Sequence, residues 1–172
     1  MAKVKHYGAY EGEGEFDLAP LLAVLAGMYD KAIIWGGNYF TDLLSPTGSW
    51  LVWDKRAGGR NLFYADCELA WSNLGITAKV FDYTWQGMIR QGDEQERYHP
   101  TQKPVELYMW CLGLADKVVI VLDPTLGSGS SLIACERLNR RCRGVEISAG
   151  YVAVTLQRWA DLTGRQPVLL DA

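Results

Sequence analysis

The stretch between residues 118 and 147 constrains the fold of this chain more than any other. It begins with five apolar residues, VVIVL, which are followed by Asp123-Pro124 and a loop of small residues, GSGSS. Apolar side chains at helical spacing come next, and a second strand-like run, 142–147, carries Glu146 near its end. A strand, a glycine turn, a helix and a strand in this order form a parallel pair with a right-handed crossover. The sequence therefore predicts an α/β fold with a mostly parallel sheet.

The small residues of this stretch suggest a ligand site. Ligands of parallel sheets bind at the carboxyl ends of the strands, where this loop would lie. Gly127 and Gly129 have no Cβ, so a ligand can approach their backbone closely. Glu146 is placed where an acidic residue commonly accepts hydrogen bonds from ribose hydroxyls. The alternative is an ordinary strand–helix–strand unit with a tight turn and no ligand.

Length and composition limit the classes that remain. With 172 residues, the chain is expected to be a single domain, 1–172, with a real core. Its formal net charge is −3, so any nucleic-acid contact must come from a local patch. The four cysteines form no CxxC pair and have no histidine cluster nearby, so no metal site is expected. Without a signal peptide or a run long enough to span a bilayer, a soluble, cytoplasmic protein is expected.

Local patterns predict further elements. An irregular arm is expected at 1–16, and Asp17 is a candidate N-cap for a helix that ends near Gly27. A long mobile loop is expected at 84–98, and a helix after Pro104. Six further elements are predicted: strands at 32–35 and 50–53, two strands that pair with each other at 68–72 and 79–83, an amphipathic helix at 151–162, and a strand-like tail at 167–170.

Two motifs carry a family resemblance. Residues 99–104 read HPTQKP, and residues 123–131 read DPTLGSGSS. In this order they resemble the amino-methylating DNA methyltransferases of the circularly permuted class, many of whose short members come from phages and prophages. The segments IIWGGNYF, SWLVWDK and DCELAWSN are similar to phage-type members as well, so the likeness covers about residues 17–160. It implies a Rossmann-like methyltransferase fold, S-adenosylmethionine as cofactor, and DNA as substrate, methylated at adenine N6 or cytosine N4.

The resemblance also assigns residues. It implies that Asp123, Gly127, Ser128 and Gly129 surround the amino-acid part of the cofactor, and that Glu146 holds the ribose hydroxyls. Helix-opening backbone amides suit a carboxylate, and Asp123 suits an ammonium group. The same resemblance implies that three residues close over the methionine end: Thr101, Gln102 and Lys103. Thr125 stands where the family usually has phenylalanine, so one apolar contact near the cofactor differs.

The catalytic signature of that family is absent from the sequence. It is a tetrad of Asp, Asn or Ser, then Pro-Pro, then Tyr or Phe, which binds the amino group and stacks on the flipped base. None of the six prolines adjoins another, so no catalytic residue can be assigned. The tetrad ends a central strand in the family, so the sheet is expected to lack a central strand. Its unpaired edges would then invite a partner strand or another copy of the chain.

Cations in two polar loops are candidates for contacts with DNA phosphates: Lys55, Arg56, Arg60 and Arg90. Solvated loop tips are the alternative reading of the same residues. Two other functions stay open beside a DNA methyltransferase. One is a non-catalytic relative that binds the cofactor or DNA, and the other is an RNA or small-molecule methyltransferase.

Overall fold

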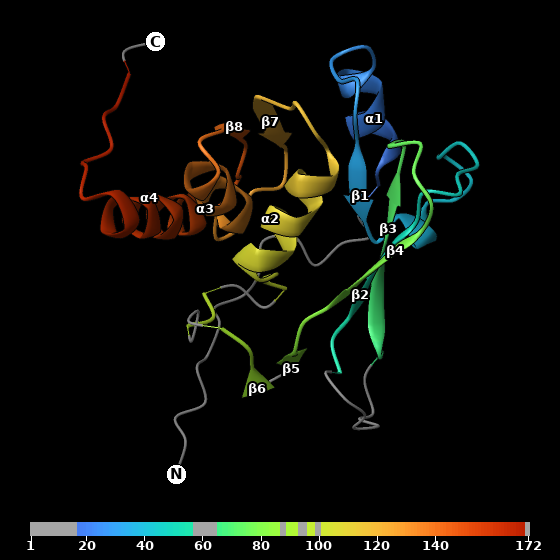
Figure 1. Cartoon of the computed structure of the whole chain (residues 1–172). Helices are drawn as coiled ribbons and strands as arrows, with labels where there is room; N and C mark the ends of the chain where they lie inside the picture. The colour runs from blue at the N-terminus through green and yellow to red at the C-terminus, as the bar shows by residue number, and fades with distance from the viewer. Residues whose placement is uncertain (1–16, 57–64, 87–88, 93–95, 99–100, 171–172) are drawn as a thin grey trace.

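The computed structural model describes residues 17–56, 65–86, 89–92, 96–98 and 101–170 (Figure 1). Within these ranges the chain forms four α-helices, one short 3-10 helix and eight strands. The helices are α1 (Ala19–Leu25), η1 (Gly37–Tyr39), α2 (Val105–Leu114), α3 (Ser130–Arg137) and α4 (Ala149–Thr163). The strands are β1 (Ile33–Trp35), β2 (Leu51–Asp54), β3 (Cys67–Ser72), β4 (Lys79–Asp82), β5 (Trp85–Gln86), β6 (Ile89–Arg90), β7 (Ile120–Asp123) and β8 (Arg141–Gly144). In the described part of the chain, no helix has the length and apolar character needed to cross a membrane.

The larger sheet has the strand order β1-β3-β2-β4. β3 runs antiparallel to both of its neighbours, whereas β4 runs parallel to β2. The predicted pairing of 68–72 with 79–83 is therefore wrong, because β2 lies between the two strands. Ser49, which precedes β2, holds the segment between β3 and β4. Its hydroxyl donates to the Ile76 carbonyl (2.7 Å) and accepts from the Ile76 amide (2.9 Å).

The smaller sheet confirms the predicted strand–helix–strand unit. β7 and β8 are parallel, and α3 connects them. Counting both sheets and the β5–β6 ladder, parallel and antiparallel pairings are mixed among the described strands. The larger sheet is therefore mixed and not mostly parallel as expected, because β3 is antiparallel to both of its neighbours. β8 also ends at Gly144, so Glu146 follows the strand by two residues.

Helix α2 lies between the two sheets (Figure 1). On one side, its Cys111 packs in a cluster with Leu51 of β2 and Ala70 of β3. On the other side, its Leu112 packs with Ile133 of α3. Helix α2 therefore joins the two sheets by burying apolar side chains against both of them.

Three segments near the ends of elements test the remaining predictions. The Asp17 carboxylate accepts a hydrogen bond from the Ala19 amide (2.9 Å), but Leu18 is the N-cap of α1, so the N-cap was predicted one residue too early. Residues 85–86 and 89–90, expected in a mobile loop, instead form the short antiparallel ladder of β5 and β6. The predicted strand at 167–170 is wrong, because this segment pairs with no strand of the described part of the chain and its three aliphatic side chains are exposed. The arm predicted at 1–16 lies outside the described residues.

Candidate cofactor loop and adjoining pocket

The loop between β7 and α3 depends on two glycines with positive φ. Gly127 has φ 56° and Gly129 has φ 81°, a region that side chains with a Cβ rarely adopt. A Cβ on Gly129 would also lie 2.6 Å from Cγ2 of Thr155 in α4. The Thr155 hydroxyl donates to the Gly127 carbonyl (3.1 Å), so α4 holds the loop in this close approach. Only glycine at position 129 satisfies both the backbone and the neighbouring helix.

Glu146 braces the same loop from the end of β8. One carboxylate oxygen accepts from the Gly127 amide (2.7 Å), and the other accepts from the Ser148 amide (2.8 Å) before α4. The Leu126 amide donates to the Val145 carbonyl (2.9 Å), which continues the contact between the loop and the chain after β8. The predicted ribose acceptor is therefore also a structural residue of the loop, a role that the sequence pattern did not indicate.

Asp123 ends β7 and binds both the loop and the helix that follows. One carboxylate oxygen accepts from the Thr125 amide (3.0 Å), and the other accepts from the Ser131 hydroxyl in the first turn of α3. The Thr125 side chain is exposed. The amides of the first helical turn have no partner within the helix, so the start of α3 presents hydrogen-bond donors beside this carboxylate.

Gln102 joins the second motif to the glycine loop. Its side chain is buried, and its amide oxygen accepts from the Ser128 hydroxyl (3.2 Å) and from the Tyr98 amide (2.7 Å). Of the three residues expected to close over the cofactor, Gln102 is the one with a described hydrogen bond to the loop. Lys103 instead reaches toward β3, and Thr101 is exposed beside it.

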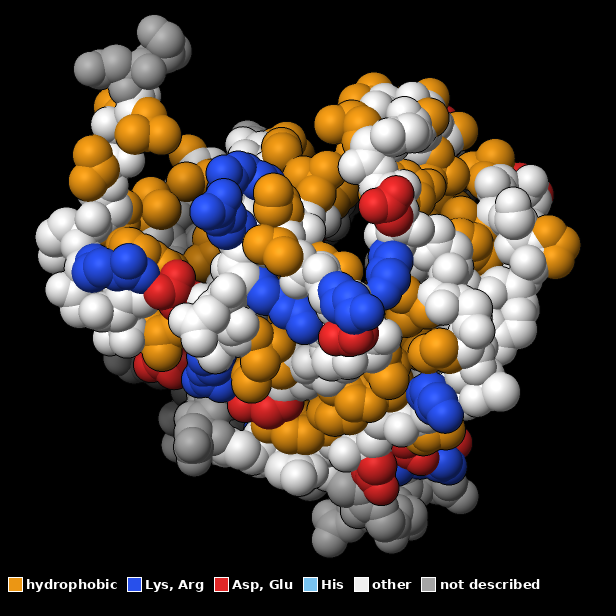
Figure 2. Space-filling model, turned by 45° about the horizontal axis from the view of Figure 1, so that its top comes forward, with side chains coloured by type: hydrophobic (Ala, Val, Ile, Leu, Met, Phe, Trp, Pro, Cys, Tyr) orange, Lys and Arg blue, Asp and Glu red, His pale blue; other side chains and the backbone are white. Residues whose placement is uncertain are grey.

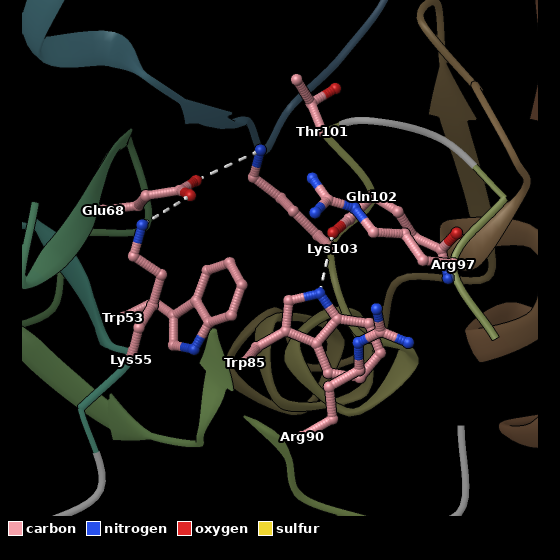
Figure 3. Close-up of a pocket in the computed structure, with 9 residues that line it drawn as sticks. All are labelled: Trp53, Lys55, Glu68, Trp85, Arg90, Arg97, Thr101, Gln102 and Lys103. Atoms are coloured by element: carbon pink, nitrogen blue, oxygen red, sulfur yellow. Dashed lines mark hydrogen bonds and ion pairs between the residues drawn. The ribbon is translucent and has the colours of Figure 1, made fainter. Parts of the chain in front are cut away.

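A pocket of about 280 Å³ opens on the other side of Gln102 (Figure 3). It combines indole rings, cations and one carboxylate. The lining residues are Trp53, Lys55, Glu68, Trp85, Arg90, Arg97, Thr101, Gln102 and Lys103. Trp85 is fixed there because its indole N–H donates to the Gln102 carbonyl (3.0 Å). Gln102 therefore lines the pocket and also contacts the glycine loop.

Glu68 stands between two lysines in this pocket. Its oxygens lie 3.2 Å from Nζ of Lys55 and 3.3 Å from Nζ of Lys103 (Figure 3). Lys55 also lies over the Trp53 ring at 5.8 Å, and Arg90 lies over the Trp85 ring at 5.3 Å. Cations outnumber carboxylates among the lining residues, so the pocket suits an anionic ligand.

The candidate phosphate contacts fall into three environments. Lys55 and Arg90 both line the pocket. Arg56 is held by Asp54 (2.9 Å) and Asp66 (3.0 Å), and its hydrogen bonds with Asp54 raise its pKa further above the usual range. Arg60 lies outside the described residues. The proposed contacts of these residues with phosphate stay predictions, and the surroundings of Lys55 and Arg90 favour them over Arg56.

The sequence patterns did not indicate two rings, one acid and one cation of the pocket: Trp53, Trp85, Glu68 and Arg97. A tryptophan two residues before a lysine at a strand end was the available signal for Trp53 and Lys55, since such residues share one face of a strand. The meeting of β3 with the segment after Tyr98 has no local signal. Within the described ranges, no cluster of three or more histidine, cysteine or acidic residues could hold a metal ion.

Comparison with known proteins places the chain in a family. The family model of the N6- and N4-type DNA methylases matches residues 49–157. The type II methyltransferase M.HpaI of Haemophilus parainfluenzae is 37% identical over 67 residues, which is 38% of this chain and 21% of that protein. M.EcaI of Enterobacter cloacae is 25% identical over 177 residues, which covers 95% of this chain and 37% of that protein. The chain thus spans between about a fifth and two fifths of these relatives.

A solved structure has the same fold. The M1.HpyAVI–SAM complex superposes with a TM-score of 0.61 at 26% identity, over 84% of each chain. A second crystal structure of M1.HpyAVI has a TM-score of 0.54 at 23% identity, over 81% of each chain. These likenesses confirm the predicted methyltransferase fold class, and the family match covers more than half of the sequence. The chain belongs to the DNA methylase family of N6- and N4-methyltransferases.

Proposed function

We propose that this chain binds S-adenosylmethionine as part of a DNA methyltransferase that acts on the exocyclic amino group of adenine (N6) or cytosine (N4). The observation that carries the proposal is the loop between β7 and α3, which Glu146 braces and Gln102 joins to the cation-rich pocket. The family match supports the same reaction. The cofactor supplies an activated methyl group, and the protein supplies binding and alignment.

The loop has hydrogen-bonding capacity left for such a cofactor. Each oxygen of Glu146 accepts one backbone amide and can accept another donor, as a ribose hydroxyl would provide. The first amides of α3 suit the cofactor's carboxylate, and Asp123 suits its ammonium group. Gly127 has no Cβ that could block the ligand, whereas the space beside Gly129 is taken by Thr155. These contacts support the roles that the family resemblance implies for Asp123, Gly127 and Glu146.

The adjoining pocket is proposed to receive nucleic acid. Lys55 and Arg90 offer charge for its phosphates, and each lies over the ring of a buried tryptophan, Trp53 or Trp85. Methyl transfer forms a carbon–nitrogen bond, breaks the carbon–sulfur bond and releases one amino proton. No residue of this chain is assigned to accept that proton, because the sequence has no Pro-Pro-aromatic tetrad.

The test is transfer of a labelled methyl group to mixed-sequence duplex DNA. The chain is assayed beside a fusion that carries a tetrad-containing N-terminal segment. We expect little or no transfer by the chain and clear transfer by the fusion. Cofactor binding without transfer by either protein would favour the non-catalytic binder instead. A preference for RNA over DNA would favour the RNA methyltransferase, and robust transfer by the unfused chain would mean that an unrecognised group replaces the tetrad.

Self-association is a further proposal, and it concerns the outer edges of the sheets. In β4, Lys79 and Asp82 would face each other if two copies paired antiparallel along this edge, so opposite charges would meet. Sedimentation of the wild type and of Val80→Pro tests this, because proline cannot donate to a neighbouring strand. A dimer that persists in the variant, or a monomer at every concentration, would rule out this edge. A cytoplasmic location and a phage or prophage origin also stay proposals, based on the sequence.

A further inference from the structure

Helix α4 holds two consecutive carbonyl groups of the glycine loop. The Thr155 hydroxyl donates to the Gly127 carbonyl (3.1 Å), and three residues further along α4 the Arg158 guanidinium donates to the Ser128 carbonyl. The same guanidinium nitrogen also donates to the Ser128 hydroxyl oxygen (3.4 Å). Residues three apart share one face of a helix, so this face of α4 is directed at the loop.

These contacts aim the Ser128 amide away from α4. The N–H and C=O groups of a trans peptide bond point in opposite directions, and the described chain has no cis peptide bond. Because Thr155 binds the Gly127 carbonyl, the Ser128 N–H of the same peptide group points to the other side. No backbone acceptor for this N–H is found among the described residues. Ser128 is buried, and buried amides are nearly always paired, so its N–H suits a ligand.

A closed set of contacts fixes Arg158 and Ser128 together. The Ser128 hydroxyl donates to the side-chain oxygen of Gln102 (3.2 Å), and the Tyr98 amide donates to the same oxygen (2.7 Å). The Arg158 guanidinium lies over the Tyr98 ring at 5.2 Å, which closes the set. Arg158 thus holds the glycine loop and also the segment that precedes the second motif.

The charge of Arg158 is placed where it suits an anion. Gly129 is the N-cap of α3, so Ser128 lies just before the positive end of that helix. A cation at this end opposes the helix dipole, whereas a carboxylate there is favourable. Arg158 therefore adds to the positive potential of α3 and does not stabilise the helix through its charge. Figure 2 shows several separate groups of Lys and Arg side chains on one face of the molecule, so contacts distinguish Arg158, not charge alone.

We propose that Arg158 is a positioning residue for the amino-acid part of S-adenosylmethionine. It acts through Ser128, which it holds so that the Ser128 amide faces the cofactor's carboxylate. Its charge also favours that carboxylate at the start of α3. The inference rests on the proposed cofactor binding at the glycine loop. It separates the amino-acid part of the cofactor from the nucleoside part, which Glu146 is proposed to hold.

The test compares the binding of two ligands to the full chain by calorimetric titration. One is S-adenosylmethionine, and the other is 5′-methylthioadenosine, which has the nucleoside and the sulfur but no amino-acid part. Arg158→Gln removes the charge, and Arg158→Lys keeps the charge but lacks the planar head that stacks on Tyr98. Arg165→Gln is the matched control, because Arg165 also lies over a ring, Trp159 at 4.7 Å, and forms an ion pair with Glu136.

We expect Arg158→Gln to weaken S-adenosylmethionine binding by about tenfold, as the loss of a charge-assisted hydrogen bond predicts. Its affinity for 5′-methylthioadenosine should match that of the wild type. Arg158→Lys should bind the cofactor with an affinity between those of the wild type and of Arg158→Gln. If Arg158→Gln does not fold, a loss in Arg158→Lys that is confined to S-adenosylmethionine supports the same inference. Arg165→Gln should bind both ligands as the wild type does.

Three results would overturn the inference and leave the proposed function intact. The first is an equal loss of affinity for both ligands in Arg158→Gln, which would indicate a merely structural role. The second is an equally large loss in Arg165→Gln. The third is wild-type affinity of Arg158→Gln for S-adenosylmethionine. A wild-type chain that binds no S-adenosylmethionine would instead overturn both the proposed function and the inference.

Discussion

The glycine loop and the cation-rich pocket lie on two sides of Gln102, and they are built in different ways. The loop takes its shape from residues close in sequence, since Asp123, Gly127 and Glu146 lie within one strand–helix–strand unit. The pocket draws side chains from β2, β3, β5, β6 and the segment before α2. A local motif therefore forms the first, whereas tertiary packing brings the second together. Substitutions in the loop should therefore change stability through the backbone, and substitutions in the pocket should change ligand binding through charge.

The largest effect is expected at Gly129. Gly129→Val forces a side chain into φ 81° and against Thr155, so the free energy of unfolding should fall by about 2–4 kcal/mol. Gly113→Ala in α2 is the control, because a Cβ there meets nothing within 4 Å, and it should stabilise the protein by about 0.5–1 kcal/mol. Urea unfolding measures both. Equal stability of Gly129→Val and the wild type would show that the loop adapts freely.

The next effect concerns Glu146, which braces the loop and is proposed to hold the ribose. Glu146→Ala should weaken S-adenosylmethionine binding by about 1–3 kcal/mol, because hydrogen bonds to a charged acceptor are lost. Glu146→Gln keeps one acceptor oxygen, so its affinity for S-adenosylmethionine should lie between those of the wild type and of Glu146→Ala. Asp161→Asn on α4 is a charge-matched control, since Asp161 bonds only to the exposed Gln157 among described contacts. Calorimetric titration giving one affinity for all four proteins would remove Glu146 from the site.

A third effect separates the pocket cations from the loop cation. Replacing Lys55, Arg56, Arg60 and Arg90 together with glutamine should abolish DNA binding with little change in Tm. Lys55→Gln and Arg90→Gln alone should each lower the salt dependence of binding by about 0.9 in log–log slope. Arg56→Gln should leave the slope nearly unchanged, because Asp54 and Asp66 already hold that guanidinium. A larger slope change for Arg56 than for Lys55 would place the DNA outside the pocket.

The smallest effect is a pH dependence at the pocket's edge. The hydrogen bonds from Arg56 hold the pKa of Asp54 below its ordinary value of 3.8. A depressed pKa contributes stability above the unfolded value, and this stability is lost as pH falls through the folded value. The stability difference between wild type and Arg56→Gln should therefore be present at about pH 6 and shrink below pH about 3.5. Denaturant unfolding at both pH values checks this, and a difference that grows in acid would contradict it.

The sequence predicted one of the two regions and not the other, for physical reasons. The order of strand, glycines and helix from Val121 to Ile133 is readable because each step has a local cause, such as the positive φ at Gly129. Pairing over long distances has no such signal, so β4 was expected beside β3, although it lies beside β2. Glu68 and Lys103 meet only because α2 brings the second motif against β3.

Whether the glycine loop binds S-adenosylmethionine is tested most directly by hydrogen exchange, measured by mass spectrometry with and without saturating cofactor. We expect slower exchange in peptides covering 119–133 and 141–149, which contain the glycine loop and Glu146. Exchange in peptides from β4, on the far edge of the larger sheet, should not change. Slower exchange confined to the pocket strands, around 51–56 and 85–90, would place the cofactor in the pocket and not at the glycine loop. Unchanged exchange throughout the chain would show that it does not bind the cofactor.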